Sequence, residues 1–273
     1  MAIITISREL AAMGDETAQE LAKLLGYRFI DKHSLEERIK SYGVVGRKFE
    51  KYDERKPSFW ASLSQDRDDY LHYLKTAMLT EAAEGGCIFI GRGASAVFRD
   101  IPGVLAVFLV APGGIRCERV KSYFHCDDKR ARQIIDQSDR DRMGFHRYFF
   151  DIEWKESSNY HLILNTGFLH PSAAAEIIKF HRDHVITSEV EIQNTARLKE
   201  LILGQQVVHH ILYKKEIPIH FLEASVAEKI VTLYGVANSQ SLVEAAVSAA
   251  REAAPSGTIN SEIQVVQEYS VTP

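Results

Sequence analysis

The first residues of the chain combine an apolar strand with a loop that could hold phosphate. Ile3 to Ile6 form a β-branched run, and the loop Ser7 to Gly14 leads into a helical pattern that starts near Asp15. In a phosphate-binding loop of the type GxxxxGK followed by Ser or Thr, glycines let backbone N–H groups surround the phosphates. The lysine neutralises them and the hydroxyl holds magnesium. This loop lacks the glycine density, the lysine and the hydroxyl. The sequence therefore indicates a phosphate-binding loop with altered chemistry.

Arg92 is the first of several arginines that could bind the phosphates of such a ligand. It lies between two glycines, directly after the apolar run Cys87 to Ile90. Open α/β sheets bind ligands at the carboxyl ends of their strands, and Arg92 follows one predicted strand. A structural role for Arg92 is the alternative.

Two further pairs of arginines are spaced along predicted helices. Arg116 and Arg119 are three residues apart and share one helix face, where they could bind a ligand or simply face solvent. Arg140 and Arg142 alternate with acidic residues within 139–142, a pattern typical of a solvated, ion-paired helix face. By residue type alone, either pair fits a phosphate site or an ordinary surface.

The histidines and cysteines indicate no metal centre. None of them has the spacing of metal ligands or of a redox-active CxxC pair. We interpret them as structural residues, and an odd number of widely spaced cysteines fits a reducing compartment. The residues concerned are His33, His125, His161, Cys87, Cys117 and Cys126.

Size and composition predict two globular domains without membrane or nucleic-acid contact. The chain has 273 residues, of which 45% are hydrophobic and 26% charged, and a net charge of −4. From residue 196 onward, six Lys or Arg stand against eight Asp or Glu, so neither part is a basic, nucleic-acid-binding domain. The longest apolar run, 104–111, is far below the ~20 residues of a membrane span. We expect a cytoplasmic protein.

Alternating apolar strands and amphipathic helices predict an α/β domain over residues 1–183. The expected strands cover 3–6, 27–31, 87–90, 104–110 and 160–165. The expected helices cover 15–25, 35–39, 59–84, 127–138 and 172–181, with one more helix that carries Arg116 and Arg119. We expect a surface loop at 43–58 and a helical arm or lid at 139–150. This alternation is typical of a parallel sheet covered by helices on both faces.

A second, smaller domain is predicted over residues 196–273, after a linker of mixed polarity at 184–195. Its expected elements are a helix (196–213), a strand (217–223), a strand (229–236), an alanine-rich helix (239–253) and a strand (259–266). This order describes a compact αββαβ unit.

Several motifs of the first domain together resemble the cytidylate kinase-like family. In sequence order they are ITISRE at 4–9, LLGY at 24–27, FIDK at 29–32, FIGRG at 89–93, Arg116 with Arg119, DRDR at 139–142 and YHLILNT at 160–166. No single motif is decisive, but their order and spacing are fairly specific. The resemblance covers roughly residues 1–183. It implies a P-loop nucleoside monophosphate kinase fold, with a parallel sheet flanked by helices.

The resemblance also implies an activity, the transfer of the γ-phosphoryl group of ATP to an acceptor of the CMP or dCMP type, with ATP and Mg2+ as cofactors. This chemistry positions two anions and neutralises their charge, which arginines can do. By resemblance, Ser7, Arg8 and Gly14 belong to the nucleotide-binding loop. Arg116 and Arg119 would add contacts on the side of the phosphate donor.

Four other residues take their expected roles from the same resemblance. Arg92 would hold the phosphate of the acceptor. Arg140 and Arg142 would be the catalytic pair, reaching from the lid onto the transferring phosphoryl group. Asp31 would contact the acceptor or order its loop, and the alternative is that it caps the next helix.

The opening loop departs from the family pattern. The family usually keeps a Gly-Ser-Gly-Gly-like stretch, whereas residues 11–14 read Ala-Ala-Met-Gly. Alanine disfavours the positive φ that glycine supplies, and methionine places an apolar side chain where a phosphate would approach. Asp15 and Glu16 suit the helix dipole but repel an incoming anion. We therefore expect weakened binding of a triphosphate.

The second domain resembles a BON domain, a module linked in other proteins to lipid or ligand binding and to assembly. KIVTLYGVANS at 229–239, the alanine-rich helix after it and INSEIQV at 259–265 carry this resemblance. An unrelated α+β dimerisation unit is the alternative. We expect a homo-oligomer or a protein partner through this domain, and no membrane contact, because its charges form no polybasic patch.

Three hypotheses follow for the whole chain. The first is an active nucleotide kinase that binds a small-molecule nucleotide through an unusual loop. The second is a non-catalytic, pseudokinase-like sensor that binds a nucleotide or another phosphorylated ligand and signals through the BON-like domain. The third is a protein in which both domains serve assembly.

Overall fold

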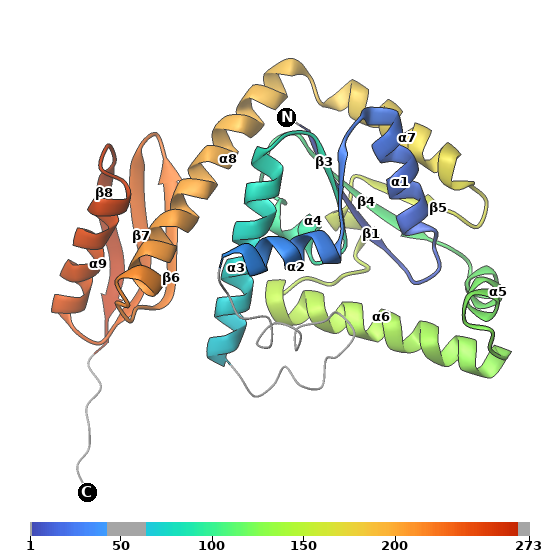
Figure 1. Cartoon of the computed structure of the whole chain (residues 1–273), viewed down its shortest axis with the longest axis horizontal. Coiled ribbons are helices and arrows are strands. Elements are labelled where there is room, and N and C mark those ends of the chain that lie inside the picture. The colour runs from blue at the N-terminus through green and yellow to red at the C-terminus, as the bar shows by residue number, and fades with distance from the viewer. Residues whose placement is uncertain (1, 43–63, 267–273) are drawn as a thin grey trace, which may run out of the picture. The chain divides into compact units, whose positions relative to one another are not determined.

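The computed structural model describes residues 2–42 and 64–266 (Figure 1). It divides into two compact units, Met1–Thr195 and Ala196–Pro273. The surface loop predicted at 43–58 and the beginning of the helix predicted at 59–84 lie outside the described residues.

The N-terminal unit is built on a five-stranded parallel sheet, which confirms the predicted α/β fold. The strands are β1 (Ile3–Arg8), β2 (Arg28–Ile30), β3 (Cys87–Ile90), β4 (Val104–Val110) and β5 (Leu162–Asn165). Their order is β2-β3-β1-β4-β5, and every neighbouring pair is parallel. The carboxyl ends of all five strands therefore share one edge of the sheet, where open α/β folds bind ligands.

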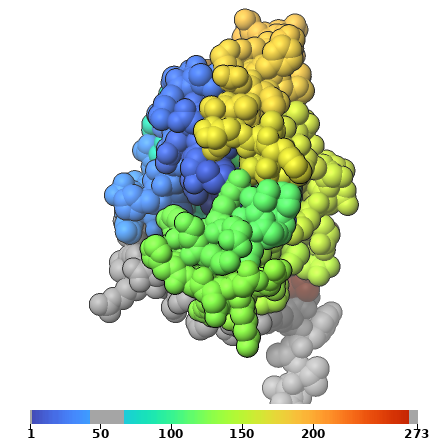
Figure 2. Space-filling view, turned by 90° about the vertical axis from the view of Figure 1, so that its right-hand side faces the viewer, coloured from blue at the N-terminus to red at the C-terminus, as the bar shows by residue number. Residues whose placement is uncertain are grey.

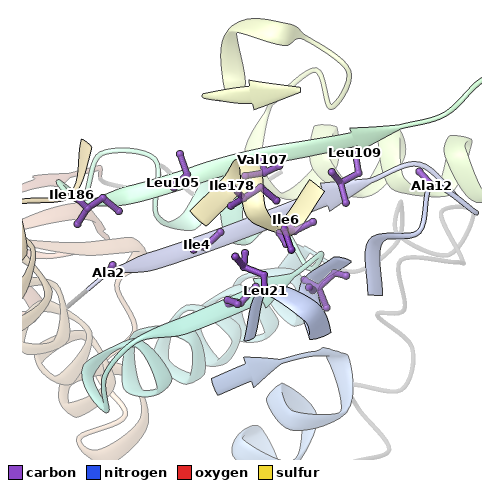
Figure 3. Packing of buried hydrophobic residues seen from close by; sticks show 14 of the residues in the cluster. Ala2, Ile4, Ile6, Ala12, Leu21, Leu105, Val107, Leu109, Ile178 and Ile186 are labelled. Carbon is purple, nitrogen blue, oxygen red and sulfur yellow. The ribbon is translucent and has the colours of Figure 1, made fainter. Parts of the chain in front are cut away.

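Helices cover both faces of this sheet. The helices of this unit within the described ranges are α1 (Gly14–Leu25), α2 (Lys32–Ser41), α3 (Ser64–Ala83), α4 (Ala94–Val97), α5 (Gly113–Phe124), α6 (Asp128–Phe150), α7 (Pro171–Val185) and the first part of α8 (Ser188–His209). On one face, Ile4 and Ile6 of β1 and Val107 of β4 form one cluster with Leu21 of α1 and Ile178 of α7 (Figure 3). The residues between them in β1 are buried on the opposite face.

Local sequence signals predicted several helix ends correctly. Gly26 ends α1 with a φ of 65°, in the left-handed region that glycine adopts most readily. Asp127 caps α6, because its carboxylate accepts a hydrogen bond from the N–H of Arg130 at 2.8 Å. Pro171 occupies the first position of α7, where its missing N–H has no cost.

The prediction that a helix ends near residue 138 is wrong. The helix α6 is continuous from Asp128 to Phe150, so the arm predicted at 139–150 is its second half. Buried residues recur every three or four positions from Ala131 to Phe149. This spacing keeps one helix face against the core and carries the helix past the charged segment.

The C-terminal unit contains the three-stranded sheet and helices expected from the αββαβ pattern. After the second part of α8 come a π-helical turn (His210–Lys214), β6 (His220–Ala227), β7 (Ile230–Ala237), α9 (Gln240–Ala253) and β8 (Thr258–Val265). The central strand β7 is antiparallel to β6 and parallel to β8. Val231 and Leu233 of β7 form the core together with Val207 of α8 and Ala246 of α9.

Residues 184–195, predicted as a linker, carry the end of α7 and the first part of α8. Thr187 separates the two helices, and its hydroxyl accepts a hydrogen bond from the N–H of Val190 at 3.3 Å, as a helix cap does. None of the helices within the described ranges is long and apolar enough to cross a membrane.

Candidate functional site

The loop between β1 and α1 lies at the carboxyl edge of the sheet and has an uncommon backbone conformation. Ala11 and Met13 have φ values of 60° and 54°, in the left-handed region. For residues with a side chain, this conformation costs roughly 1–2 kcal/mol each. At both positions the family pattern has glycine. The loop therefore keeps a backbone that suits glycine although its residues are alanine and methionine.

Glycine is needed at position 14 for a steric reason and not for its φ. It begins α1, and a β-carbon at this position would lie 2.5 Å from the Cγ of Arg8. Ser7, one residue earlier, is buried in β1, with its Oγ 3.5 Å from the Oγ of Ser95. Of the three residues predicted to belong to the nucleotide loop, Arg8 and Gly14 therefore lie against each other at the loop, whereas Ser7 packs within the sheet.

Three side chains hold the carbonyl groups of the loop. Arg116 Nε donates to the carbonyl of Leu10 at 2.8 Å. Arg119 Nη1 donates to the carbonyl of Ala11 at 2.9 Å, and Thr166 Oγ1 donates to that of Ala12 at 2.9 Å. The donors come from α5 and from the residue after β5. These bonds offset the cost of the left-handed residues and fix the direction of the loop's peptide groups.

Several N–H groups at the loop lack a hydrogen-bond partner in the described part of the chain. Within the described residues, the N–H groups of Ala11, Met13 and Gly14 have no hydrogen-bond acceptor. The first-turn N–H groups of Asp15 and Glu16 likewise have none there. Successive N–H groups at a left-handed turn and a helix N-terminus together favour an anion. The loop backbone is therefore suited to bind phosphate.

The charges around the loop have opposing effects on an anion. Arg119 also donates to the carbonyl of Thr166 at 2.8 Å, so its guanidinium binds two neutral groups and adds a positive charge behind the loop. Asp15 and Glu16 are exposed in the first turn of α1 and add negative charge beside it. In Figure 2, the blue surface of the first residues lies beside the green surface of α5 and α6.

A network of four charged residues, three of them nearly buried, joins this loop to α5 and α6. Arg116 donates through Nη2 to both carboxylate oxygens of Asp139, at 2.9 and 3.0 Å, and its Nη1 lies 3.3 Å from Glu9 Oε2. Lys155 Nζ donates to Glu9 Oε1 at 2.8 Å and lies 3.3 Å from Asp139 Oδ2. Two acids and two bases make the network neutral as a whole, and each charge has a partner.

Lys155 is charged within this network. Burial by itself would lower the pKa of its ammonium group, but the hydrogen bond to Glu9 and the charge of Asp139 raise this pKa above its usual value. The side chain of Lys155 is 45% exposed, compared with 11% for Glu9 and 11% for Asp139. It is therefore the member of the network that solvent reaches most easily.

The sequence interpretation missed the roles of Glu9, Asp139, Lys155 and Thr166. Two of them had a usable signal: Glu9 follows β1 and Thr166 follows β5, both at the edge of the sheet where ligands bind. Lys155 had none. It lies 146 residues from Glu9 in the chain, in an irregular segment after α6.

Arg92 is buried and contacts residues of α2 and α3. Its φ is 55°, and its side chain is only 5% exposed. Nη2 lies 3.3 Å from the Glu36 carboxylate of α2, and Nη1 donates to the Tyr70 hydroxyl of α3 at 3.4 Å. Gly93 allows the close approach of α6, because a β-carbon there would collide with the Phe150 ring.

The two arginines predicted as a catalytic pair point in different directions. Two positions along a helix correspond to a rotation of roughly 200°, so they cannot share a face. Arg140 is exposed and donates to Gln137 at 3.1 Å, whereas Arg142 is buried and bonds to Ser138. Asp31, predicted for the acceptor site, caps α2 by accepting from the N–H of Ser34 at 2.9 Å.

Comparison with a solved structure agrees with this fold. An uncharacterized protein from Eubacterium ventriosum is 20% identical, with 67% of this chain and 99% of that chain covered and a TM-score of 0.53. A shikimate kinase from Bacteroides thetaiotaomicron is 19% identical, with 68% and 99% covered and a TM-score of 0.40. At 20% identity, the likeness to the first of these structures concerns the fold alone. Among proteins with curated functions, none matches the chain.

The sequence profile of the cytidylate kinase-like family matches residues 3–167. The matched region is more than half of the chain. It includes the loop, Arg92, both arginines of α5, the network on α6 and Thr166. The chain therefore belongs to the cytidylate kinase-like family.

Proposed function

We propose that the N-terminal unit binds ATP at the loop 9–14 and transfers a phosphoryl group to a nucleoside monophosphate of the CMP or dCMP type. One observation carries the proposal. Three carbonyl groups of the loop are held by Arg116, Arg119 and Thr166, and the N–H groups of Ala11, Met13 and Gly14 have no acceptor within the described residues. Family membership supplies the reaction class, because the family is named for cytidylate kinase.

The acceptor would bind beside Arg92. This residue follows β3, the neighbour of β1 in the sheet, so it belongs to the same carboxyl edge as the loop. Its guanidinium interacts with Glu36, whose side chain is 40% exposed. An incoming phosphate would have to compete with that carboxylate. We therefore expect acceptor binding that is weaker than an unpaired arginine would support.

Magnesium would accompany the ATP. Carboxylate oxygens are the ligands that Mg2+ prefers in proteins, and Asp15 and Glu16 place two of them at the N-terminus of α1. No group of three His, Cys, Asp or Glu within the described ranges could hold a metal by itself. Mg2+ would therefore be held jointly by these carboxylates and the phosphate oxygens. When bound, it neutralises charge that develops on the transferring group.

A coupled assay of the purified chain with ATP, Mg2+ and CMP, dCMP or UMP tests the proposal. We expect acceptor-dependent formation of ADP with CMP or dCMP. The rate should be low, because the loop has no lysine to neutralise the phosphates. Turnover equal to that of a buffer blank with all three acceptors would overturn the proposed reaction.

Regulated binding without catalysis is the second candidate function, and the charge pairing favours it. Arg92 interacts with Glu36, and Arg116 and Lys155 with Glu9 and Asp139. A chain with its cations paired in this way could bind a nucleotide without accelerating transfer. The ligand would then signal through the C-terminal unit, which we propose to be BON-like and to bind a protein partner or a second copy of the chain. Nucleotide binding without turnover would support this candidate.

A further inference from the structure

The loop lacks a lysine, but an ammonium group lies beside it in the folded chain. Lys155 Nζ is 2.8 Å from Glu9 Oε1, and Glu9 is the first residue of the loop. We infer that Lys155 supplies the positive charge that a lysine within the loop would supply, and that it binds a phosphate oxygen of the nucleotide. This inference rests on the proposed binding of ATP at the loop.

Solvent exposure makes Lys155, and not Arg116, the residue of the network that can bind a phosphate. The side chain of Arg116 is 6% exposed, and its donors are directed to Leu10, Asp139 and Glu9. Lys155 is 45% exposed. Its ammonium group has three N–H donors, and two of them reach the carboxylates of Glu9 and Asp139. One donor is left for an anionic oxygen.

The electrostatic balance also suits this role. Arg116 and Asp139 already form a compensated pair, because Nη2 of Arg116 donates to both carboxylate oxygens of Asp139. Lys155 is then the cation that compensates Glu9 and that a phosphate approaching from solvent meets. Since lysine is a compact point charge on a flexible stem, it can turn from the carboxylate to a phosphate without moving the backbone.

A structural role for Lys155 makes a different prediction. In that case the ammonium group serves only to neutralise Glu9 and to hold the segment after α6. Removing the charge of Glu9 together with that of Lys155 would then restore ligand binding. If Lys155 binds the phosphate itself, the double variant would remain defective. The pair Lys155→Gln and Glu9→Gln/Lys155→Gln therefore separates the two roles.

Isothermal titration of the full chain with ATP and Mg2+, and with pyrophosphate, is the test. We expect Lys155→Gln to weaken both ligands by about tenfold or more, as loss of a charge-assisted hydrogen bond does. The double variant should remain at least about fivefold weaker than the wild type, because that phosphate contact is still missing. Lys155→Arg should bind more tightly than Lys155→Gln, since it keeps the charge.

Lys121→Gln is the matched control, because Lys121 is also a partly exposed, ion-paired lysine of this unit, bonded to Glu118. It should bind as the wild type does. A wild type that binds neither ATP nor pyrophosphate would overturn the proposed function and the role of Lys155 with it. If the wild type binds and Lys155→Gln binds equally well, or if the double variant recovers fully, only the role of Lys155 is overturned.

Discussion

Two residues of the loop hold a left-handed backbone because other side chains fix the peptide groups around them. Ala11 and Met13 have positive φ, and Arg116, Arg119 and Thr166 bind the adjoining carbonyls. Alanine and methionine at positions where the family pattern has glycine therefore raise the conformational energy of the loop and leave its backbone shape unchanged. The conformational cost should be measurable as a loss of stability.

Glycine at position 11 should stabilise the protein. Ala11→Gly removes the steric cost of roughly 1–2 kcal/mol at a φ of 60°. It also raises the conformational entropy of the unfolded chain, which lowers the gain in stability by about 0.4–1 kcal/mol. We expect a gain of about 0–1.6 kcal/mol in the free energy of urea unfolding.

The control is the same substitution in an ordinary helix. Ala245 is exposed in α9, and Ala245→Gly should destabilise by about 1 kcal/mol. A loss of stability in Ala11→Gly as large as in this control would show that alanine is not strained in the loop.

Thr166 should matter more for ligand binding than for folding. Thr166→Val removes the donor to the carbonyl of Ala12, so that peptide group can turn and the N–H groups can lose their common direction. We expect ATP to bind about three- to tenfold more weakly, with a stability loss of about 1 kcal/mol from the lost hydrogen bond.

Thr195→Val is matched to this change, because the Thr195 hydroxyl also donates to a carbonyl, that of Glu191 in α8, at 2.8 Å. It should lower stability by a similar amount and leave the affinity for ATP unchanged. Equal effects of the two variants on ATP affinity would contradict the role given to Thr166.

At the scale of elements, the strands and the helix ends were predictable because their causes are local. Apolar runs, Gly26, Asp127 and Pro171 act within a few residues of themselves. The site was less predictable, because its contacts join distant segments. The bond between Lys155 and Glu9 joins the segment after α6 to the end of β1, 146 residues apart, and no spacing along the chain encodes that contact. Asp31 is the opposite example. Its role as a helix cap is local, and the sequence offered this role as the alternative to a contact with the acceptor.

The junction of β4 and β5 should make stability depend on pH. The ring Nδ1 of His161 accepts a hydrogen bond from the backbone N–H of Ala106 at 2.9 Å, and the backbone N–H of His161 donates to the carbonyl of Ala106 at 2.8 Å. Partial desolvation of the ring, and then the charge of His181, lowers the pKa of His161. The folded state therefore favours the neutral ring, whereas the unfolded chain takes up a proton below about pH 6.5.

The direction of the pH dependence of stability follows from this difference in proton binding. The contribution of His161 is complete above about pH 6.5 and is lost as the pH falls towards the lowered pKa of the folded state. Urea unfolding at pH 7.5 and 5.5 should show a smaller loss of stability in His161→Gln than in the wild type. His33→Gln, at an exposed position of α2, should keep the wild-type loss. Equal losses of stability in all three proteins would refute the role of His161 in the pH dependence.

At the scale of the whole molecule, the two units predict a localised response to ligand. ATP at about 100 times its dissociation constant should add about 2.7 kcal/mol to the stability of the unit that binds it. Hydrogen exchange should therefore slow in β1, β3 and β4 and stay unchanged in β7. Equal slowing in β7 would contradict independent units and favour the candidate in which the ligand signals to the C-terminal unit.

The central claim is that the backbone N–H groups of the loop bind nucleotide phosphate. Amide NMR spectra of the full chain, recorded while ATP with Mg2+ or pyrophosphate is added, test it most directly. We predict the largest downfield shifts at Ala11, Met13 and Gly14, whose N–H groups have no acceptor among the described residues. Unchanged amide positions for these three residues at saturating ligand would contradict the claim.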